Sequence, residues 1–209
     1  MRILAVSDQV VKGIYSSHIR KRFGHVDIVV SCGDLPYSYL EYIVSMLDVP
    51  CFFVHGNHDG PIHTADGCVL TEPGGWIDLD GRTVESKGVL LAGLEGSIRY
   101  RPDGCFQYTE GEMTFKALQL ALALAMNRVR YGRYLDILVT HAPPLGIHDG
   151  KDWPHRGFKV FLDLMDRFRP RYLLHGHKHI YGLEAWQTHY RNTKVINVYP
   201  YRVIEWKHR

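Results

Sequence analysis

Short apolar runs recur along the chain and alternate with longer segments of helical character. The runs are rich in Val, Ile, Leu and Phe without polar alternation, which is typical of strands buried on both faces of a sheet. They span Ile3–Val6, Asp27–Val30, Cys51–Val54, Val89–Ala92, Leu135–Thr140 and Arg171–Leu174. The segments between them predict helices over Ser17–Phe23, Ser38–Leu47, Glu112–Arg130 and Lys159–Arg167. This alternation of strands and helices predicts a layered α/β fold.

Two regions follow a different pattern. Gly74–Arg82 alternates polar and apolar residues up to an Asp-Gly turn, and Trp186–Trp206 reads as strands with a turn at Arg191-Asn192. We expect these regions to contribute a second, more antiparallel sheet packed on the first. Because no repeat or flexible linker divides the sequence, we expect residues 1–209 to form one domain. The Leu/Ala stretch at 118–125 in the longest helix is interpreted as core packing.

Composition and charge narrow the classes of protein that this chain can be. Hydrophobic residues make up 45% and charged residues 22%, as in ordinary soluble proteins. A formal net charge of +3 is too small to indicate a nucleic-acid scaffold. The four cysteines show no paired spacing, which favours reduced thiols and a cytoplasmic location. The apolar stretch Ile3–Val6 is too short for a signal peptide or a membrane span, so no membrane partner is expected.

The most informative positions are those at which the apolar runs end. Each of five runs is followed within a few residues by Asp, Asn or His. The segments are Ser7-Asp8, Gly33-Asp34, His55-Gly56-Asn57-His58-Asp59, Thr140-His141 and His175-Gly176-His177-Lys178-His179. Ligands of α/β sheets bind beyond the carboxyl ends of the strands, so we expect these side chains to meet at one edge. Carboxylates, one amide and imidazoles together suit Mn, Fe, Zn or Ni better than calcium.

These motifs resemble those of the calcineurin-like metallophosphoesterases, small bacterial-type phosphodiesterases and phosphatases in particular. Gly33-Asp34, Gly56-Asn57-His58-Asp59, His141 and Gly176-His177-Lys178-His179 follow the family order at appropriate separations. The resemblance implies a four-layer α/β/β/α sandwich with two mixed sheets flanked by helices. It also implies two divalent transition-metal ions, for which we favour Mn.

The resemblance further assigns roles to individual residues. Asp34 would bridge both ions. Asp8 and His179 would complete the first site, and Asn57, His141 and His177 would complete the second site. His58 would contact the phosphate and protonate the leaving oxygen.

Some residues around these ligands are expected to assist them. Asp59 would orient the His58 ring, because a carboxylate on one ring nitrogen fixes the tautomer and raises basicity. Arg99 follows another strand end and could pair with a phosphate oxygen. His148 and His155 lie in a polar segment after His141 and are candidate substrate-binding residues, although such a segment can equally be solvated surface.

One position departs from the family pattern. The family has a histidine two residues after the first aspartate, and Val10 stands there. Valine cannot bind a metal, so the first site keeps only Asp8, Asp34 and His179 as protein ligands. Three protein ligands plus water still make a workable catalytic site, but the ion should bind more weakly. Gln9 could supply an amide oxygen, but in an extended segment it would point away from Asp8.

The expected function is hydrolysis of a phosphomonoester or phosphodiester by a metal-bound hydroxide, with His58 assisting the leaving group. Small-molecule phosphoesters are favoured over nucleic acid because the net charge is weak. One alternative is a poorly active, metal-binding scaffold, which Val10 keeps open. The other is a nuclease, which a long basic stripe would favour, whereas basic residues here are scattered. The physiological substrate, the mono- or diesterase preference and the oligomeric state are left open.

Overall fold

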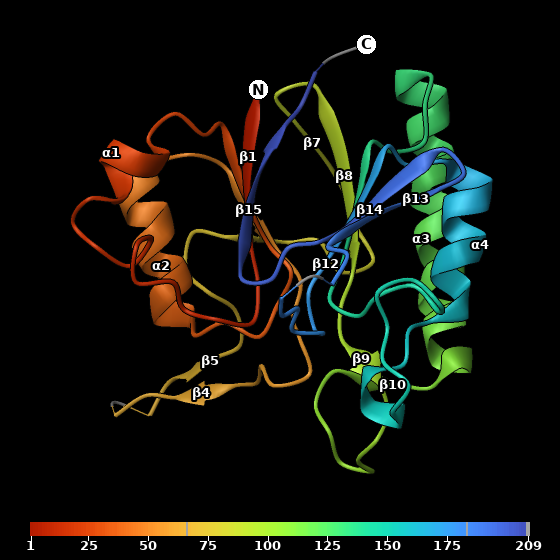
Figure 1. Ribbon diagram of the computed structural model, residues 1–209, viewed down its shortest axis with the longest axis horizontal. Coiled ribbons are helices and arrows are strands. Elements are labelled where there is room, and N and C mark those ends of the chain that lie inside the picture. Colours follow the sequence, from red (N-terminus) through yellow and green to blue (C-terminus); the bar gives the residue numbers. More distant parts are fainter. Residues whose placement is uncertain (66, 183, 208–209) are drawn as a thin grey trace.

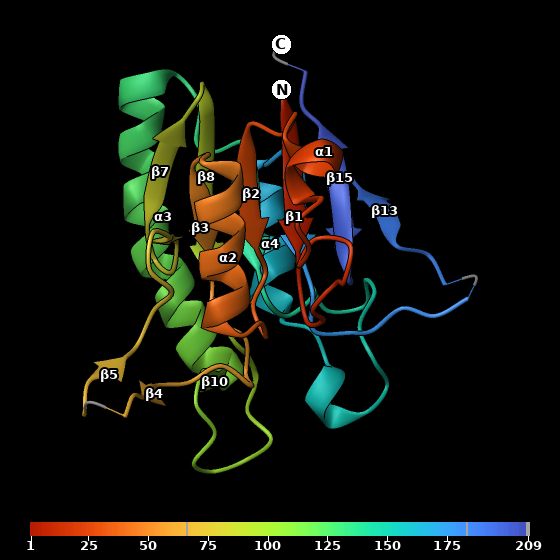
Figure 2. The ribbon, with the colours of Figure 1, turned by 90° about the vertical axis from the view of Figure 1, so that its left-hand side faces the viewer.

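Two mixed β-sheets face each other at the centre of the molecule, and helices cover the outer side of each (Figure 1). The structure is a computed structural model that describes residues 1–65, 67–182 and 184–207. The first residues of the chain and the segment around Trp206 lie together at one end of the sheets, where the Met1 amino group donates to the Trp206 carbonyl oxygen (Figures 1 and 2). The expected four-layer arrangement of two sheets between helices is confirmed.

The first sheet comes mostly from the N-terminal half of the chain. Its order is β15-β1-β2-β3-β6, with β15 antiparallel to β1 and the other pairs parallel. The strands are β1 (Arg2–Val6), β2 (Ile28–Ser31), β3 (Cys51–Phe53), β6 (Ile77–Asp78) and β15 (Tyr201–Glu205). Helices α1 (Ile19–Phe23) and α2 (Tyr37–Leu47) cover its outer face.

The second sheet has the order β13-β14-β12-β11-β8-β7 and is antiparallel only at its two edges. Its strands are β7 (Thr83–Ser86), β8 (Val89–Leu94), β11 (Ile137–Thr140), β12 (Tyr172–His175), β13 (Gln187–Tyr190) and β14 (Thr193–Asn197). Helices α3 (Glu110–Tyr131) and α4 (Lys159–Phe168) cover it. Short pairs outside the two sheets are β4 (Ile62–His63) with β5 (Val69–Leu70) and β9 (Ser97–Ile98) with β10 (Gln107–Tyr108).

The strands are apolar throughout because both of their faces are buried. Along β1, Ile3 and Ala5 point into the core between the two sheets, while Leu4 and Val6 point toward α1 and α2. A third core lies between the second sheet and the helices α3 and α4. The continuous apolar runs in the sequence therefore correspond to central strands, as predicted.

The expectation of a separate antiparallel sheet is wrong in detail. Residues 74–82 do not form a hairpin, because β6 pairs in parallel with β3 in the first sheet and β7 joins the second. The C-terminal strands are also divided, since β13 and β14 extend the second sheet while β15 returns to the first. Period-two alternation indicated strands correctly but carried no information about which sheet each strand joins.

Helix α3 begins at a reciprocal cap, in which the Thr109 side chain accepts from the Glu112 N–H and the Glu112 carboxylate accepts from the Thr109 N–H. Its Leu/Ala stretch is only partly core, contrary to expectation. Leu120 and Leu124 are buried, whereas Leu118 and Leu122 are 57% and 73% exposed.

Within the described part of the chain, no helix is both long and apolar enough to cross a membrane.

Candidate metal centre

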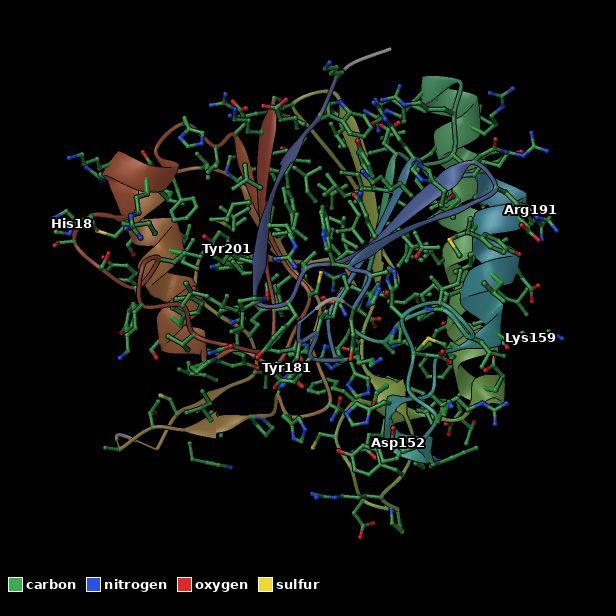
Figure 3. The ribbon with its side chains drawn as sticks, in the orientation of Figure 1. His18, Asp152, Lys159, Tyr181, Arg191 and Tyr201 are labelled. Carbon is green, nitrogen blue, oxygen red and sulfur yellow. The ribbon has the colours of Figure 1, made fainter. Side chains whose placement is uncertain are left out.

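The predicted metal ligands follow the carboxyl ends of the strands, at the end of the sheets opposite the start of β1. Asp8 follows β1, Asp34 follows β2, His141 follows β11 and His177 follows β12. Figure 3 labels Asp152 and Tyr181, which belong to loops at this same end. The parallel strand order of both sheets brings these strand ends together.

Three of the candidate ligands have left-handed backbone conformations. The φ angles are 62° at Asp8, 57° at Asp34 and 65° at His177. Such conformations are uncommon for residues other than glycine and cost on the order of 1–3 kcal/mol each. They turn the chain sharply just past the strand, which points the side chain across the sheet edge instead of along the strand direction.

Two glycines allow the loops to approach the ligands closely. A methyl group at Gly56 would collide with the Asp34 carboxylate. One at Gly176 would collide with the side chains of Ser7 and Asp8. The glycines next to Asn57 and His177 are therefore required by the close approach of neighbouring side chains.

Four donor atoms converge at the second site. His141 Nε2 lies 3.0 Å from Asn57 Oδ1, 3.1 Å from His177 Nδ1 and 3.3 Å from Asp34 Oδ2. Two ligands at right angles, each roughly 2.1 Å from an ion, are about 3.0 Å apart. Asp34, His141 and His177 together form a group able to hold a metal ion. The spacing and the mixture of nitrogen and oxygen donors therefore fit a divalent transition metal.

Protein groups around the second site hold these donors in orientation. His141 Nδ1 lies 2.7 Å from the Cys32 carbonyl oxygen, and His177 Nε2 lies 2.8 Å from that of Pro154. With those nitrogens donating, the opposite ring nitrogens face the site. Asn57 donates from Nδ2 to the Tyr100 hydroxyl at 3.0 Å, which turns its carbonyl oxygen inward. Contacts of this kind fix the tautomer and ring orientation of metal ligands.

The charges at this site are strongly coupled. Burial works against ionisation of Asp34, but the adjacent His141 holds the pKa of that carboxyl at about 2. Burial also lowers the pKa of His141, yet the neighbouring carboxylates of Asp34 and Asp8 raise it to about 9. Burial and the nearby His141 lower the pKa of His177 to about 3. The site therefore favours a positive charge on His141, and a bound cation would compete with that proton.

The first site is looser. His179 Nε2 lies 3.9 Å from Asp8 Oδ1, and the His179 side chain is 45% exposed. Asp8 itself is buried, which raises its pKa, and its carboxylate accepts from the His177 N–H and the Ser7 hydroxyl. Val10 is on the surface and offers no donor. Asp8 and His179 are thus near one another, without the mutual contacts seen in the second site.

The amide oxygen of Gln9 is engaged by a tyrosine next to the first site. Because Asp8 adopts a left-handed conformation, the segment is not extended there. Gln9 Oε1 accepts from the Tyr199 hydroxyl at 2.8 Å. The Tyr199 ring stacks on His179, with centroids 4.3 Å apart. Gln9 therefore lies on the His179 side and supports the aromatic residue beneath that ligand.

His58 and Asp59 do not pair in this structure. His58 is exposed and lines the cleft, and its backbone N–H donates to Asp34 Oδ1 at 2.8 Å. Asp59 Oδ2 accepts from the N–H groups of Gly56 and Asp34 at 2.7 and 2.9 Å. Among the described residues, no hydrogen bond joins the Asp59 carboxylate to the His58 ring. Asp59 thus organises the backbone that carries Asp34, a role that sequence reasoning did not assign.

An open cleft of about 410 Å³ lies over the candidate ligands. Its lining residues are Asp34, His58, Asp152, His155, His177, Lys178, His179 and Tyr181. His155 therefore reaches the cleft as expected, while Asp152, Lys178 and Tyr181 had been given no role. Lys178 was detectable in principle, because it stands between two candidate ligands in the Gly-His-Lys-His motif.

Two candidate substrate residues are engaged elsewhere. Arg99 forms an ion pair with Glu112 at 2.9 Å and donates to the Gln107 carbonyl oxygen. His148 lies 3.0 Å from His175 and 2.8 Å from the Thr188 hydroxyl, measured between polar atoms. Neither residue lines the cleft. The structure therefore does not support a direct substrate contact for either of them.

A larger hollow of about 670 Å³ lies at the opposite end of the second sheet. Its lining includes Arg128, Arg133, Arg167, Arg169 and Arg171. Asp136 also lines it, and this carboxylate is held by Arg133 at 3.0 Å. Its described lining contains neither histidine nor cysteine, so the smaller cleft is the one equipped for metal chemistry.

Comparisons with known proteins agree with this geometry. The family model for calcineurin-like phosphoesterases matches residues 1–181. The crystal structure of TT1561 from Thermus thermophilus superposes with a TM-score of 0.62 at 18% identity, covering 94% of this chain and 88% of that one. A second crystal structure also gives 0.62, at 15% identity, covering 94% and 90%. Likeness at such low identity shows a shared fold. None of the curated proteins matches the sequence.

Proposed function

This chain belongs to the calcineurin-like phosphoesterase family, and we propose that it hydrolyses small phosphomonoesters or phosphodiesters at a centre for two divalent metal ions. Membership implies metal-dependent hydrolysis of phosphoesters. The observation that carries the proposal is the buried group of four donors around His141, whose spacing suits an ion. Mn is the favoured metal among Mn, Fe, Zn and Ni.

Asp34 would contribute to both ions, with Asn57, His141 and His177 on the second and Asp8 and His179 on the first. Bound divalent ions would polarise the phosphoryl group and activate water at neutral pH. The proposed ligands of the second ion are oriented by residues from distant parts of the chain. His141, Asn57 and His177 hydrogen-bond to Cys32, Tyr100 and Pro154, in that order. This rigid support favours catalysis, because the ligands need no rearrangement when an ion binds.

The cleft favours a small substrate. Its volume of about 410 Å³ lies within the usual range of small-molecule pockets. Lys178, which pairs with Glu184 at 3.4 Å, lies in its wall and would turn its ammonium to a phosphoryl oxygen. The Nδ1 atom of His155 contacts the Asp152 carboxylate, which leaves Nε2 to donate a hydrogen bond to the substrate. His58 is exposed in the same cleft and would donate a proton to the departing oxygen. Its backbone N–H is held by Asp34 Oδ1, and Asp59 anchors the neighbouring backbone of Asp34 and Gly56.

Hydrolysis of a generic aryl phosphodiester with added Mn²⁺ tests the proposal. We expect turnover that chelator abolishes. His58→Ala should retain its metal but lose roughly 10²–10⁴-fold in turnover on esters with poor leaving groups, the usual contribution of a general acid. His25→Ala, at an exposed histidine that follows the end of α1 and does not line the cleft, is the matched control.

Two results would contradict this assignment. Loss of metal together with activity in His58→Ala would make that residue a ligand. Full metal occupancy without hydrolysis of any mono- or diester would favour the alternative of a metal-binding scaffold, to which the missing donor at Val10 points. A protein with neither metal nor hydrolysis would contradict both.

A further inference from the structure

An apolar stripe runs along the solvent-facing side of helix α3. It consists of Phe115, Leu118, Leu122, Met126 and Val129, which are 62%, 57%, 73%, 67% and 82% exposed. Single exposed apolar residues are common, but a contiguous apolar patch on a soluble protein marks an interaction site. The stripe lies opposite the buried face of the same helix, so its side chains do not pack against the second sheet.

Helix propensity alone does not explain these residues. Leu and Met are good helix formers, so Leu118, Leu122 and Met126 would be acceptable on an isolated surface. Phe and Val are poorer helix formers, yet Phe115 and Val129 occupy the two ends of the stripe. At about 100° per residue, all five side chains fall within roughly 40° of the direction of Leu122. So narrow a stripe is typical of a helix that packs against another helix.

The spacing of the stripe is symmetric about Leu122. Phe115 and Val129 each lie seven positions from it, and Leu118 and Met126 each lie four positions from it. If a second α3 lay antiparallel across a two-fold axis at Leu122, Phe115 would face Val129 and Leu118 would face Met126. Interfaces between identical subunits have this self-complementary form.

The charges on α3 favour the antiparallel arrangement. Its first turn carries Glu110 and Glu112, and its last turn carries Arg128 and Arg130. Antiparallel pairing places the acidic end of each helix beside the basic end of the other, whereas parallel pairing would place like charges together. The 22 residues of α3 extend about 33 Å, which is long enough for the contact to span several turns.

We propose that the stripe on α3 is a homodimer interface, in which two copies of the chain pair antiparallel across Leu122. Helix α3 lies at one side of the molecule (Figure 2), and none of the stripe residues lines the cleft. The dimer therefore leaves both clefts open, and this inference does not depend on the proposed hydrolysis.

Site-specific crosslinking tests both the contact and its symmetry. The background variant Cys68→Ser/Cys105→Ser removes the two exposed thiols, while Cys32 and Cys51 are buried. With diamide as the oxidant, Leu122→Cys should form a disulfide dimer, because the two copies of this position meet on the axis. Leu118→Cys alone is the matched control. Its two copies are separated along the helix by about 12 Å, so it should stay monomeric on a non-reducing gel. A mixture of Leu118→Cys and Met126→Cys should crosslink.

Sedimentation analysis provides the second measurement. The wild-type chain of 24.1 kDa should show twice that mass at tens of micromolar, and Leu122→Glu should be monomeric with an unchanged circular dichroism spectrum. Val69→Glu, at an exposed valine in β5, should remain dimeric. A monomeric wild type, or equal crosslinking by Leu118→Cys and Leu122→Cys, overturns the proposal. If the wild type is monomeric and binds lipid vesicles, and if Leu122→Glu abolishes that binding, the stripe binds a lipid surface and the dimer proposal is overturned.

Discussion

The two halves of the candidate metal centre share Asp34 but differ in how their other ligands are held. In the second site, Asn57, His141 and His177 are buried, and each is oriented by a hydrogen bond from its far side. In the first site, His179 is largely exposed and lies 3.9 Å from Asp8.

The comparison shows that two metal sites built from the same set of motifs can differ in how firmly their ligands are held. The donors of the second site are held by hydrogen bonds to Cys32, Tyr100 and Pro154, so we expect little reorganisation to oppose binding of an ion. The first site must draw an exposed imidazole toward a buried carboxylate, and Val10 contributes nothing. We therefore expect one tight ion and one weaker ion, with activity following the weaker.

The largest effect is expected from Asp34→Asn, which removes the charge that both sites share. Both ions should be lost at micromolar metal, and turnover should fall by at least roughly 10²-fold. Elemental analysis and the aryl phosphodiester assay measure the two effects. Asp48→Asn is the matched control, since Asp48 also has a left-handed φ of 53° but ends α2 far from the cleft. Retention of two ions by Asp34→Asn would show that this residue does not bridge them.

A pair of alanine variants should separate the two sites. His141→Ala should lose the tight ion, and chelator should then have little effect on its melting temperature. His179→Ala should keep the tight ion, and chelator should lower its melting temperature as in the wild type, because an ion bound only to the folded state stabilises it by mass action. Identical responses of the two variants to chelator would remove the distinction between the sites.

A smaller effect is expected from pH in the metal-free protein. The pKa of His141 is raised to about 9, so the folded state binds more protons than the unfolded state above pH 6.5. That stabilisation is complete below pH 6.5 and is lost as the pH rises through 9. Melting temperature should therefore fall across this window without metal and fall less with saturating Mn²⁺, which takes the place of the proton. Metal affinity should rise over the same window.

The smallest effect is expected from Val10→His, which restores a donor to the first site. The weaker ion should bind on the order of tenfold more tightly, while the tight ion is unchanged. Val10→Leu, which adds bulk without a donor, should leave both affinities unchanged. Calorimetric titration measures both constants. Two equally tight ions in the wild type, unaffected by Val10→His, would show that another group has filled the position.

Much of the fold and the grouping of the ligands followed from sequence. Apolar runs predicted the central strands, and their carboxyl ends must meet because neighbouring parallel strands point the same way. That geometric constraint groups Asp34 and Asn57, which follow the paired strands β2 and β3. His141 follows β11 of the second sheet, and it was grouped with them by the order of the family motifs. The glycines and the order of the motifs indicated the family. The family in turn predicted the four layers of the fold and showed that Val10 departs from the usual pattern.

Tertiary structure alone decided how these residues are supported and which surfaces are exposed. The carbonyl groups that orient His141 and His177 belong to Cys32 and Pro154, and backbone acceptors leave no mark on residue type. Leu118 and Leu120 are equally apolar, yet one is exposed and the other buried. When a helix has apolar residues on two opposite sides, its sequence shows the helical period but not which of the two sides faces the core. Only the position of the second sheet determined which side of α3 faces the core.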